Sequence, residues 1–309
     1  MIKRDVIVIG AGAAGLFCAA QAGARGRSVE VLDHAKKVGR KILMSGGGRC
    51  NFTNMYAGPE NFLSQNPHFC KSALSRYTQW DFIGLVAEYG IAYHEKTLGQ
   101  LFCDDSAKEI VDLLLNECNK ADVTITTRCD ILSVEKNESG YSLTTSNGEY
   151  ECESLVIATG GLSMPKLGAT PFGYKIAQQF GLNVLPTRAA LVPFTLHDKD
   201  KDTLAELSGI AVDVYASCND TTFKEAMLFT HRGLSGPAML QISSYWEAGD
   251  SLSINMLPND DATALLQTAR TETPDALLAT CLNKVFPNSK LIHFNDLIFN
   301  EYSQLNKIY

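Results

Sequence analysis

The chain has 309 residues, of which 45% are hydrophobic and 20% are charged. This is the composition of a packed globular protein, and it excludes intrinsically disordered and collagen-like chains. At roughly 150 residues per domain, the length predicts about two domains. The net charge of −7 argues against a protein whose main task is to neutralise a nucleic-acid backbone.

The N-terminal residues predict a β-α-β unit. A strand is expected over Ile2 to Ile9, a helix rich in small residues over Leu16 to Gly23, and a second strand over Val29 to Asp33. Such a unit favours a parallel sheet with a right-handed crossover. The uncharged stretch from Val6 to Ala24 imitates a signal peptide, but Asp5 and four glycines argue against export or membrane insertion.

A G-x-G-x-x-G turn joins the first strand to the helix. In this context the first glycine permits a tight turn, the second lets the backbone approach a pyrophosphate, and the third lets the helix pack on the strand. Asp33 follows where a carboxylate accepts hydrogen bonds from ribose hydroxyls. The alternative is a glycine-rich turn without a ligand. The predicted dinucleotide-binding residues are Gly10, Gly12, Ala13, Ala14, Gly15 and Asp33.

A second glycine cluster, Gly46 to Gly48, lies in a basic loop expected from Lys36 to Asn54. Ordering three consecutive glycines costs entropy, so they favour close approach of backbone to a ligand, with N–H groups that suit an anion. The alternative is a mobile surface loop with solvated basic residues. Because position 55 is Met55, the cysteine pair of flavin-dependent disulfide reductases is absent, and Cys50 is expected to be a thiol buried beside a cofactor.

The middle of the chain alternates helices and strands. Helical patterns lie around Lys71 to Tyr77 and Phe82 to Tyr89, and a capping box of Ser106 and Glu109 predicts a helix over 107–119. Further strands are expected over Val123–Thr127, Ile131–Glu135, Tyr141–Ser146 and Leu155–Ala158. The last strand is apolar on both faces and is therefore expected inside the parallel sheet.

Beyond Pro186 the pattern changes to short strands with turn residues, and beyond Pro258 it becomes helical again. We therefore expect a Rossmann-like domain over 1–186, a mostly β domain over 187–258 and a partial helical insert over 259–309. The expected strands are 192–194, 210–216, 228–230 and 251–257, and the expected helices are 262–270 and 276–286. Nine cysteines without C-x-x-C or zinc-ligand spacing predict reduced thiols in a cytoplasmic protein and no metal site.

His231 and Arg232 are the candidate catalytic residues. They lie in the segment from Leu228 to Pro237, which precedes a helix expected to begin at Ser235 as N-cap and to end near Trp246. These two side chains are suited to stabilising negative charge or donating a proton to a reduced substrate. The alternative is structural hydrogen bonding, because a single histidine in a sequence is weak evidence.

Four segments carry a resemblance to a known family: Gly10–Gly15, Lys41–Asn54, Ala158–Gly173 and Leu228–Pro237. With them, the chain resembles the BaiN-like family of NAD(P)/FAD-dependent oxidoreductases, in particular its YhiN-type members. The resemblance implies FAD as cofactor, an α/β two-dinucleotide-binding-type flavoprotein fold and an inserted β-barrel-like domain. It also implies further cofactor contacts, with Ile131 at the adenine, Thr159 and Gly160 over the dinucleotide, and Lys41, Gly47, Gly48, Arg49, Cys50 and Asn51 at the flavin end.

The resemblance also implies that the end of the chain is unusual. Members of the family continue with a Gly-Glu-containing strand and a helix that faces the flavin, and the residues after Leu291 contain no such motif. We therefore expect a C-terminally truncated member with weak FAD retention and marginal stability.

The expected function is FAD-dependent hydride transfer between flavin and a small unsaturated or imine-like substrate, with NAD(P)H as a candidate donor. Only one complete G-x-G-x-x-G is present, so NAD(P)H has no crossover unit of its own. The alternative is a catalytically impaired nucleotide-binding remnant. An RNA-modifying enzyme is disfavoured by the net charge and by the lack of clustered exposed aromatics interleaved with arginine. The expected partners are therefore a small molecule, with no nucleic acid and no membrane.

Overall fold

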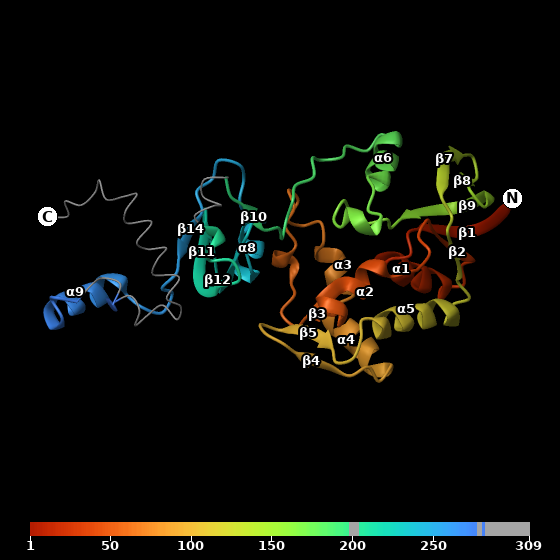
Figure 1. Ribbon diagram of the computed structural model, residues 1–309. Coiled ribbons are helices and arrows are strands. Elements are labelled where there is room, and N and C mark those ends of the chain that lie inside the picture. Colours follow the sequence, from red (N-terminus) through yellow and green to blue (C-terminus); the bar gives the residue numbers. More distant parts are fainter. Residues whose placement is uncertain (198–203, 277–279, 282–309) are drawn as a thin grey trace. The chain divides into compact units, whose positions relative to one another are not determined.

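The computed structural model describes residues 1–197, 204–276 and 280–281. The chain forms two compact units, Met1–Leu185 and Pro186–Tyr309. The first carries the crossover predicted at the N-terminus, and the second carries an antiparallel sheet (Figure 1).

A six-stranded sheet with the order β6-β2-β1-β9-β8-β7 forms the centre of the first unit. β1 (Ile2–Ile9) lies between β2 (Val29–Asp33) and β9 (Gly148–Ile157) and is parallel to both. The predicted α/β Rossmann-like fold is therefore confirmed. β6 (Thr124–Thr127) pairs in parallel with β2, whereas β8 (Gly140–Thr145) and β7 (Ile131–Asn137) extend the sheet antiparallel beyond β9.

β9 is longer than the strand expected over Leu155 to Ala158. It begins at Gly148, where a φ of +117° at the hairpin turn favours glycine. Its first half pairs with β8 on one side and with β1 on the other, so one strand joins the antiparallel and the parallel parts of the sheet. The first half was not predicted as part of the strand because it contains three glutamates, which are unusual in a buried strand: Glu149, Glu151 and Glu153.

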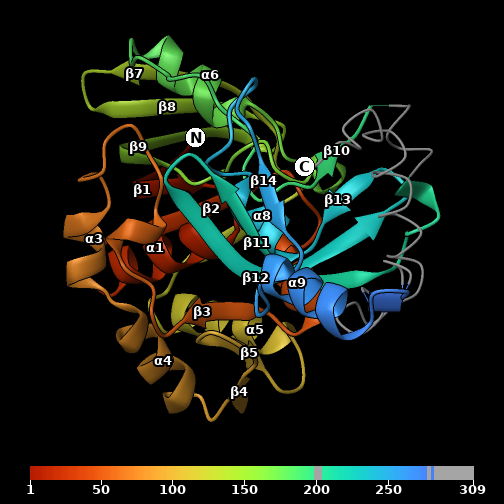
Figure 2. The ribbon, with the colours of Figure 1, turned by 90° about the vertical axis from the view of Figure 1, so that its left-hand side faces the viewer.

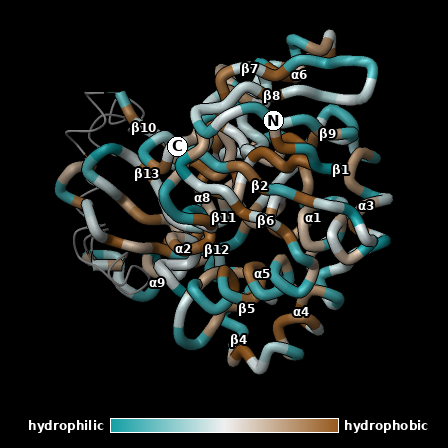
Figure 3. The backbone as a smooth tube through the Cα atoms, turned by 90° about the vertical axis from the view of Figure 1, so that its right-hand side faces the viewer, coloured by the Kyte–Doolittle hydropathy of each residue, from teal (hydrophilic) through white to brown (hydrophobic). Residues whose placement is uncertain are grey.

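Two helices cover one face of the parallel strands. α1 (Ala13–Gly23) packs on the sheet through Leu16 and Ala19, and α5 (Lys108–Lys120) packs against α1 through residues such as Leu114. Figure 3 shows hydrophobic and hydrophilic residues alternating along α5, as an amphipathic helix requires. The small side chains of α1 allow this close packing. The helix begins at Ala13, inside the G-x-G-x-x-G motif and before the start expected at Leu16.

The basic region expected to be a loop from Lys36 to Asn54 contains regular structure. It holds α2 (Arg40–Met44), the 3₁₀ turn η1 (Ser45–Gly48) and β3 (Asn51–Asn54). The loop expectation was wrong because the short apolar run of α2 packs against the core through Ile42. β3 pairs with β5 (Gln100–Cys103), which also pairs with β4 (Tyr93–Glu95); α3 (Lys71–Arg76), α4 (Gln79–Glu88) and η2 (Pro59–Asn61) lie between β3 and β4 in the chain.

The second unit contains a five-stranded antiparallel sheet with the order β10-β13-β12-β11-β14. Its core is formed by β11, β12 and α8, with Val214, Met227 and Met239 fully buried. The strands are β10 (Phe194–Thr195), β11 (Ala211–Cys218), β12 (Thr221–Thr230), β13 (Gly233–Ser235) and β14 (Ser253–Asn255), and the helices are α8 (Pro237–Ile242) and α9 (Ala262–Glu272).

The helix expected to begin at Ser235 and end near Trp246 is shorter than predicted. Ser235 belongs to β13, and Gly236 is the N-cap of α8 with a φ of +91°. A Cβ on Gly236 would lie 2.7 Å from the carbonyl oxygen of Ala226, so β12 approaches too closely for serine to take that position. The helix expected over Ala276 to Phe286 lies largely outside the described residues.

Within the described ranges, the structure contains no helix with both the length and the apolar character needed to cross a membrane.

Candidate functional site

A cavity of about 660 Å³ opens where β1, β2 and β9 end at their carboxyl termini. Ligands of open α/β sheets bind at this edge. The lining comes from the first unit alone: Ile9–Ala14, Leu32–Ala35, Lys37, Gly39–Ile42, Cys129–Ile131, Ile157–Gly160, Leu167–Thr170 and Phe172.

Packing requires glycine at two of the three glycine positions in the turn at this edge, and the third position has open space beside it. A Cβ on Gly10 would lie 2.5 Å from the carbonyl oxygen of Ala158, and one on Gly15 would lie 1.8 Å from that of Gly10. A Cβ on Gly12 would meet nothing within 4 Å. The protein's own packing therefore does not explain Gly12, and the space beside it belongs to the cavity.

The N-terminus of α1 points its free backbone donors into this cavity. Gly12 is the N-cap and has no side chain that could cap the helix, and the first turn carries no acidic residue. Ala13 and Ala14 line the cavity. The unpaired N–H groups and the positive end of the helix dipole make this terminus suitable for an anion.

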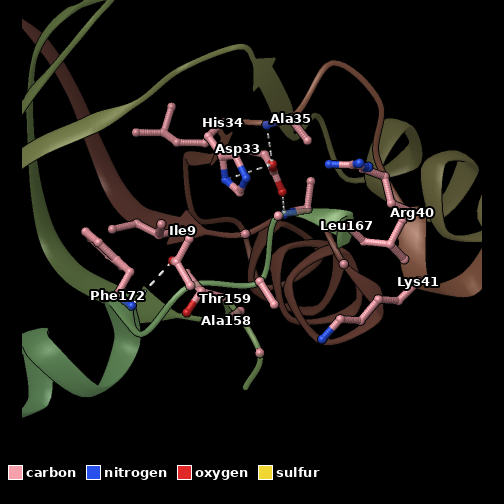
Figure 4. Close-up of a pocket in the computed structure, with 18 of the residues that line it drawn as sticks. Ile9, Asp33, His34, Ala35, Arg40, Lys41, Ala158, Thr159, Leu167 and Phe172 are labelled. Carbon is pink, nitrogen blue, oxygen red and sulfur yellow. Dashed lines mark hydrogen bonds and ion pairs between the residues drawn. The ribbon is translucent and has the colours of Figure 1, made fainter. Parts of the chain in front are cut away.

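Asp33 holds the glycine turn to the end of β2. Its Oδ2 accepts a hydrogen bond from the Ala11 N–H over 2.6 Å, and its Oδ1 accepts one from the Ala35 N–H over 2.7 Å. Figure 4 shows the carboxylate between these two backbone segments, with His34 beside it. Each carboxylate oxygen has a second lone pair, so Asp33 can still accept hydrogen bonds from hydroxyls.

The Lys41 side chain connects α2 with the loop that follows β9. Its Nζ donates to Ser163 Oγ over 3.2 Å, and a Cβ on Gly160 would lie 3.5 Å from the same nitrogen. Arg40 precedes it on α2 and also lines the cavity (Figure 4). The structure thus brings Lys41 to the same cavity as Thr159 and Gly160, which lie more than a hundred residues later in the sequence.

The second glycine cluster has left-handed backbone throughout. The φ angles of Gly46, Gly47 and Gly48 are +57°, +66° and +91°. A Cβ on Gly46 would meet the ring of Phe102 at 2.8 Å, whereas Gly47 and Gly48 face open space. Packing therefore explains Gly46 alone, and the other two leave backbone accessible to a ligand.

Cys50 is buried beside a second cavity in the first unit. This cavity has a volume of about 480 Å³ and a largely apolar lining that includes Phe17, Phe52, Tyr77 and Phe82. Burial raises the pKa of the Cys50 thiol, and a hydrogen bond with Ser45 opposes this shift. The thiol is thus held in its protonated form. The lining shared by both cavities is Ala13, Ala14, Lys41 and Ile42.

Some of the other predicted cofactor contacts line one of the two cavities, and some line neither. Ile131, Thr159 and Gly160 line the larger cavity, and Asn51 lines the smaller one. Gly47, Gly48 and Arg49 line neither. The sequence analysis missed His34, Asp130, Thr170 and Phe172 as lining residues. Asp130 directly precedes the strand expected from Ile131, whereas Phe172 begins α6 (Phe172–Gln179), a helix that was not predicted. No local pattern in the sequence marks either residue as part of a site.

His231 and Arg232 lie in the exposed turn between β12 and β13 of the second unit. The Arg232 N–H donates to Thr230 Oγ over 3.3 Å, and its carbonyl oxygen accepts from the Leu196 N–H over 3.1 Å. These backbone bonds fix the turn and leave both side chains exposed.

Comparisons with known proteins agree with this arrangement. Residues 4–274 match the model of the HI0933-like protein Rossmann domain. The chain is 58% identical over 309 residues to the "Ribosomal RNA dihydrouridine synthase" of Escherichia coli, covering all of this chain and 75% of that protein. It is 53% identical to the protein of the same name from Haemophilus influenzae, over 91% of this chain and 71% of that protein. It is 26% identical to the "3-dehydro-bile acid delta(4,6)-reductase" of Clostridium scindens, over 92% and 73%.

The first two relatives contradict one expectation. The sequence analysis expected a small-molecule substrate and no nucleic acid, because the net charge of the whole chain is negative. Both relatives are named for action on ribosomal RNA. The prediction was wrong because net charge averages over the whole molecule and conceals local regions of opposite sign.

Proposed function

Because the chain belongs to the HI0933-like Rossmann-domain family of FAD-binding oxidoreductases, we propose that it reduces a uridine of ribosomal RNA to dihydrouridine. The observation that carries this proposal is the 58% identity, over the whole chain, to a protein named for this activity. FAD as the cofactor is confirmed at the level of the family. The substrate is our proposal.

The residues around the larger cavity fit FAD. The open space beside Gly12 accommodates a pyrophosphate on the N-terminus of α1, where Ala13 and Ala14 present backbone N–H groups. Asp33 lies within the same cavity with free lone pairs for a ribose. We assign Gly10, Gly12 and Gly15 to the pyrophosphate turn, Asp33 to the adenosine ribose and Ile131 to the adenine.

We assign the flavin end to the region around α2 and η1. Lys41 extends toward Gly160, and its ammonium group would favour negative charge on the ring system or on a bound substrate. Gly47, Gly48, Arg49, Cys50 and Asn51 complete this end in our assignment, and Thr159 and Gly160 cover the dinucleotide. The left-handed backbone at Gly47 and Gly48 is the structural support for this part.

FAD held in this cavity would, when reduced, supply the hydride that adds to the C5–C6 double bond of uracil, and a proton would complete dihydrouracil. The protein's residues orient the base, exclude water and provide that proton. We retain His231 as the candidate proton donor and Arg232 as the candidate for stabilising charge on the base. NAD(P)H remains our candidate for the electron donor, and it would have to bind without a second glycine-rich crossover.

The test is a reaction of the FAD-loaded chain with NADPH and ribosomal RNA from a strain that lacks the modification. Mass spectrometry of nuclease fragments is expected to show dihydrouridine in one fragment, and RNA incubated with heat-inactivated protein serves as control. If NADPH reduces the flavin but no fragment gains hydrogen, the substrate assignment is wrong.

A further inference from the structure

The stretch from Lys36 to Arg76, here called the basic segment, has a charge opposite to that of the chain. It contains seven lysine and arginine residues and one carboxylate, Glu60, which gives a net charge of +6 in a chain of net charge −7. In the part of the chain that the structure describes, none of the seven cations forms an ion pair, whereas Lys3, Lys108 and Lys120 do. The seven are Lys36, Lys37, Arg40, Lys41, Arg49, Lys71 and Arg76.

The same segment exposes large apolar side chains. Every residue from Glu60 to Phe69 is exposed, and within this run Phe62 retains 48% of its surface and Phe69 80%. Tyr56, just before the run, is 71% exposed. The sequence analysis expected no clustered exposed aromatics interleaved with arginine. The structure exposes these three rings in the stretch between Arg49 and Arg76, with no arginine among them. The sequence did not reveal this cluster because aromatic residues are buried more often than not.

Local contacts hold the basic segment together and attach it to the rest of the first unit. The Cys70 Sγ at the start of α3 donates to the carbonyl oxygen of Pro59, and Gln79 Nε2 donates to that of Met55 over 3.0 Å. The rings of Phe17 on α1 and Tyr77 after α3 have centroids 4.8 Å apart. Figure 2 shows α3 beside α1. The cations of α3 are thus held close to the helix whose N-terminus faces the larger cavity.

The basic segment also forms walls of both cavities. Lys37, Arg40 and Lys41 line the larger one, and Lys41, Ser45 and Asn51 line the smaller one. A polyanion held on the exposed part of the segment would therefore lie next to both cavities of this unit.

We propose that the basic segment is the surface on which the first unit binds the RNA strand around the target uridine. This inference rests on the proposed function, and it assigns the RNA contacts within it. The five cations of the segment that are not assigned to FAD bind phosphates, and Tyr56, Phe62 and Phe69 stack on unpaired bases. The five are Lys36, Lys37, Arg40, Lys71 and Arg76. Single-stranded RNA has this combination of dense negative charge and flat apolar faces, and proteins bind it with cations and exposed aromatics. A second copy of this chain carries the same positive segment and would be repelled by it.

Two double variants separate the charge from the stacking. K71Q/R76Q removes two cations, and F62S/F69S removes two exposed rings, without touching residues assigned to FAD. The matched controls are K136Q and L132S, which alter an exposed lysine and an exposed leucine on β7. The measurements are binding to a ribosomal RNA transcript as a function of salt, dihydrouridine yield, flavin content and thermal unfolding.

We expect K71Q/R76Q to weaken RNA binding about tenfold and to reduce the slope of log affinity against log salt by roughly 0.7 per removed cation. F62S/F69S is expected to weaken binding by about tenfold or more with an unchanged slope. Flavin content, thermal unfolding and both controls are expected to match the unaltered chain. Independently of any substitution, RNA is expected to slow hydrogen exchange of the amides from Glu60 to Phe69.

Different failures identify different errors. If the unaltered chain makes dihydrouridine and both double variants bind RNA equally well, the surface is assigned wrongly and the proposed function stands. If the unaltered chain neither binds nor modifies ribosomal RNA, the proposed function fails as well. If the variants change only self-association, the segment is a contact between copies and the inference is wrong.

Discussion

The carboxylate of Asp33, at the end of β2, bonds to the backbone N–H of Ala11 in the glycine turn after β1 over 2.6 Å. Its other oxygen accepts the N–H of Ala35. One side chain therefore fixes the shape of the turn and presents its remaining lone pairs to the cavity. The residue thus has a structural role and a proposed binding role, and experiments must separate them.

Replacing Asp33 with alanine is expected to weaken FAD binding at least tenfold and to destabilise the chain by about 1–3 kcal/mol, since two backbone donors lose their acceptor. Flavin fluorescence titration and urea unfolding measure the two effects. Asp5→Ala is the matched control, because Asp5 also accepts a backbone N–H, that of Ser28, but lies in the middle of β1 and does not line the cavity. Unchanged FAD affinity in Asp33→Ala would exclude the ribose assignment.

The glycines of the turn offer a sharper separation of folding from binding. Gly12→Ala adds a methyl group into open space, so it is expected to unfold like the unaltered chain while binding FAD at least tenfold more weakly. Gly15→Ala places a methyl group 1.8 Å from the Gly10 carbonyl oxygen and is expected to lower the thermal unfolding temperature strongly. Normal FAD binding by Gly12→Ala would show that the pyrophosphate lies elsewhere.

Because several thiols are buried, we expect the stability of the folded chain to decrease at alkaline pH. Burial raises the pKa of Cys103 to about 12 and the pKa values of Cys118 and Cys152 to about 11, from an ordinary value of 9.0. A raised folded-state pKa contributes stability that is present below pH 9 and lost as the pH rises toward these values. The free energy of unfolding in urea is therefore expected to fall between about pH 9 and 11.

The same burial predicts selective alkylation. At pH 8, iodoacetamide is expected to modify Cys70, which is half-buried, and to spare Cys103, Cys118 and Cys152 in the folded chain. Peptide mass spectrometry with and without urea measures this difference. Rapid modification of Cys103 in the folded chain would contradict the packing around β5.

His231→Ala and Arg232→Ala test the proposed catalytic roles. Both side chains are exposed, and the turn is held by backbone bonds, so unfolding and FAD affinity are expected to stay unchanged. Loss of a general acid is expected to slow the reduction of RNA by about a hundredfold or more. The rate of flavin reduction by NADPH in the same samples is the control, and unaffected RNA reduction would remove these residues from the mechanism.

The N-terminal crossover could be predicted from sequence because it depends on local rules. β1 and β2 occur at the predicted residues, since β-branched runs and the glycine turn determine them within about thirty residues of chain. The positions of Asp33 and of Gly10, Gly12 and Gly15 around one cavity follow from that unit.

Other parts depend on contacts between distant residues. The proximity of Lys41 to Gly160 depends on how α2 packs against the core, and β9 extends to Gly148 because β8 pairs with it. The tertiary structure decides which aromatic residues of the basic segment are exposed. The hydrophobicity of a residue does not show whether that particular residue is buried. The expectation of no nucleic acid was wrong because it gave the charge of the whole chain more weight than the local positive charge of the basic segment.

The most direct test of the account is a single turnover without oxygen. The FAD-loaded chain is reduced completely, freed of excess reductant and mixed with unmodified ribosomal RNA, while the flavin absorbance is recorded. We predict that the yellow colour of oxidised flavin returns in proportion to the dihydrouridine formed, and that RNA already carrying the modification leaves the flavin reduced. Reduced flavin that persists in the presence of unmodified RNA would contradict the account.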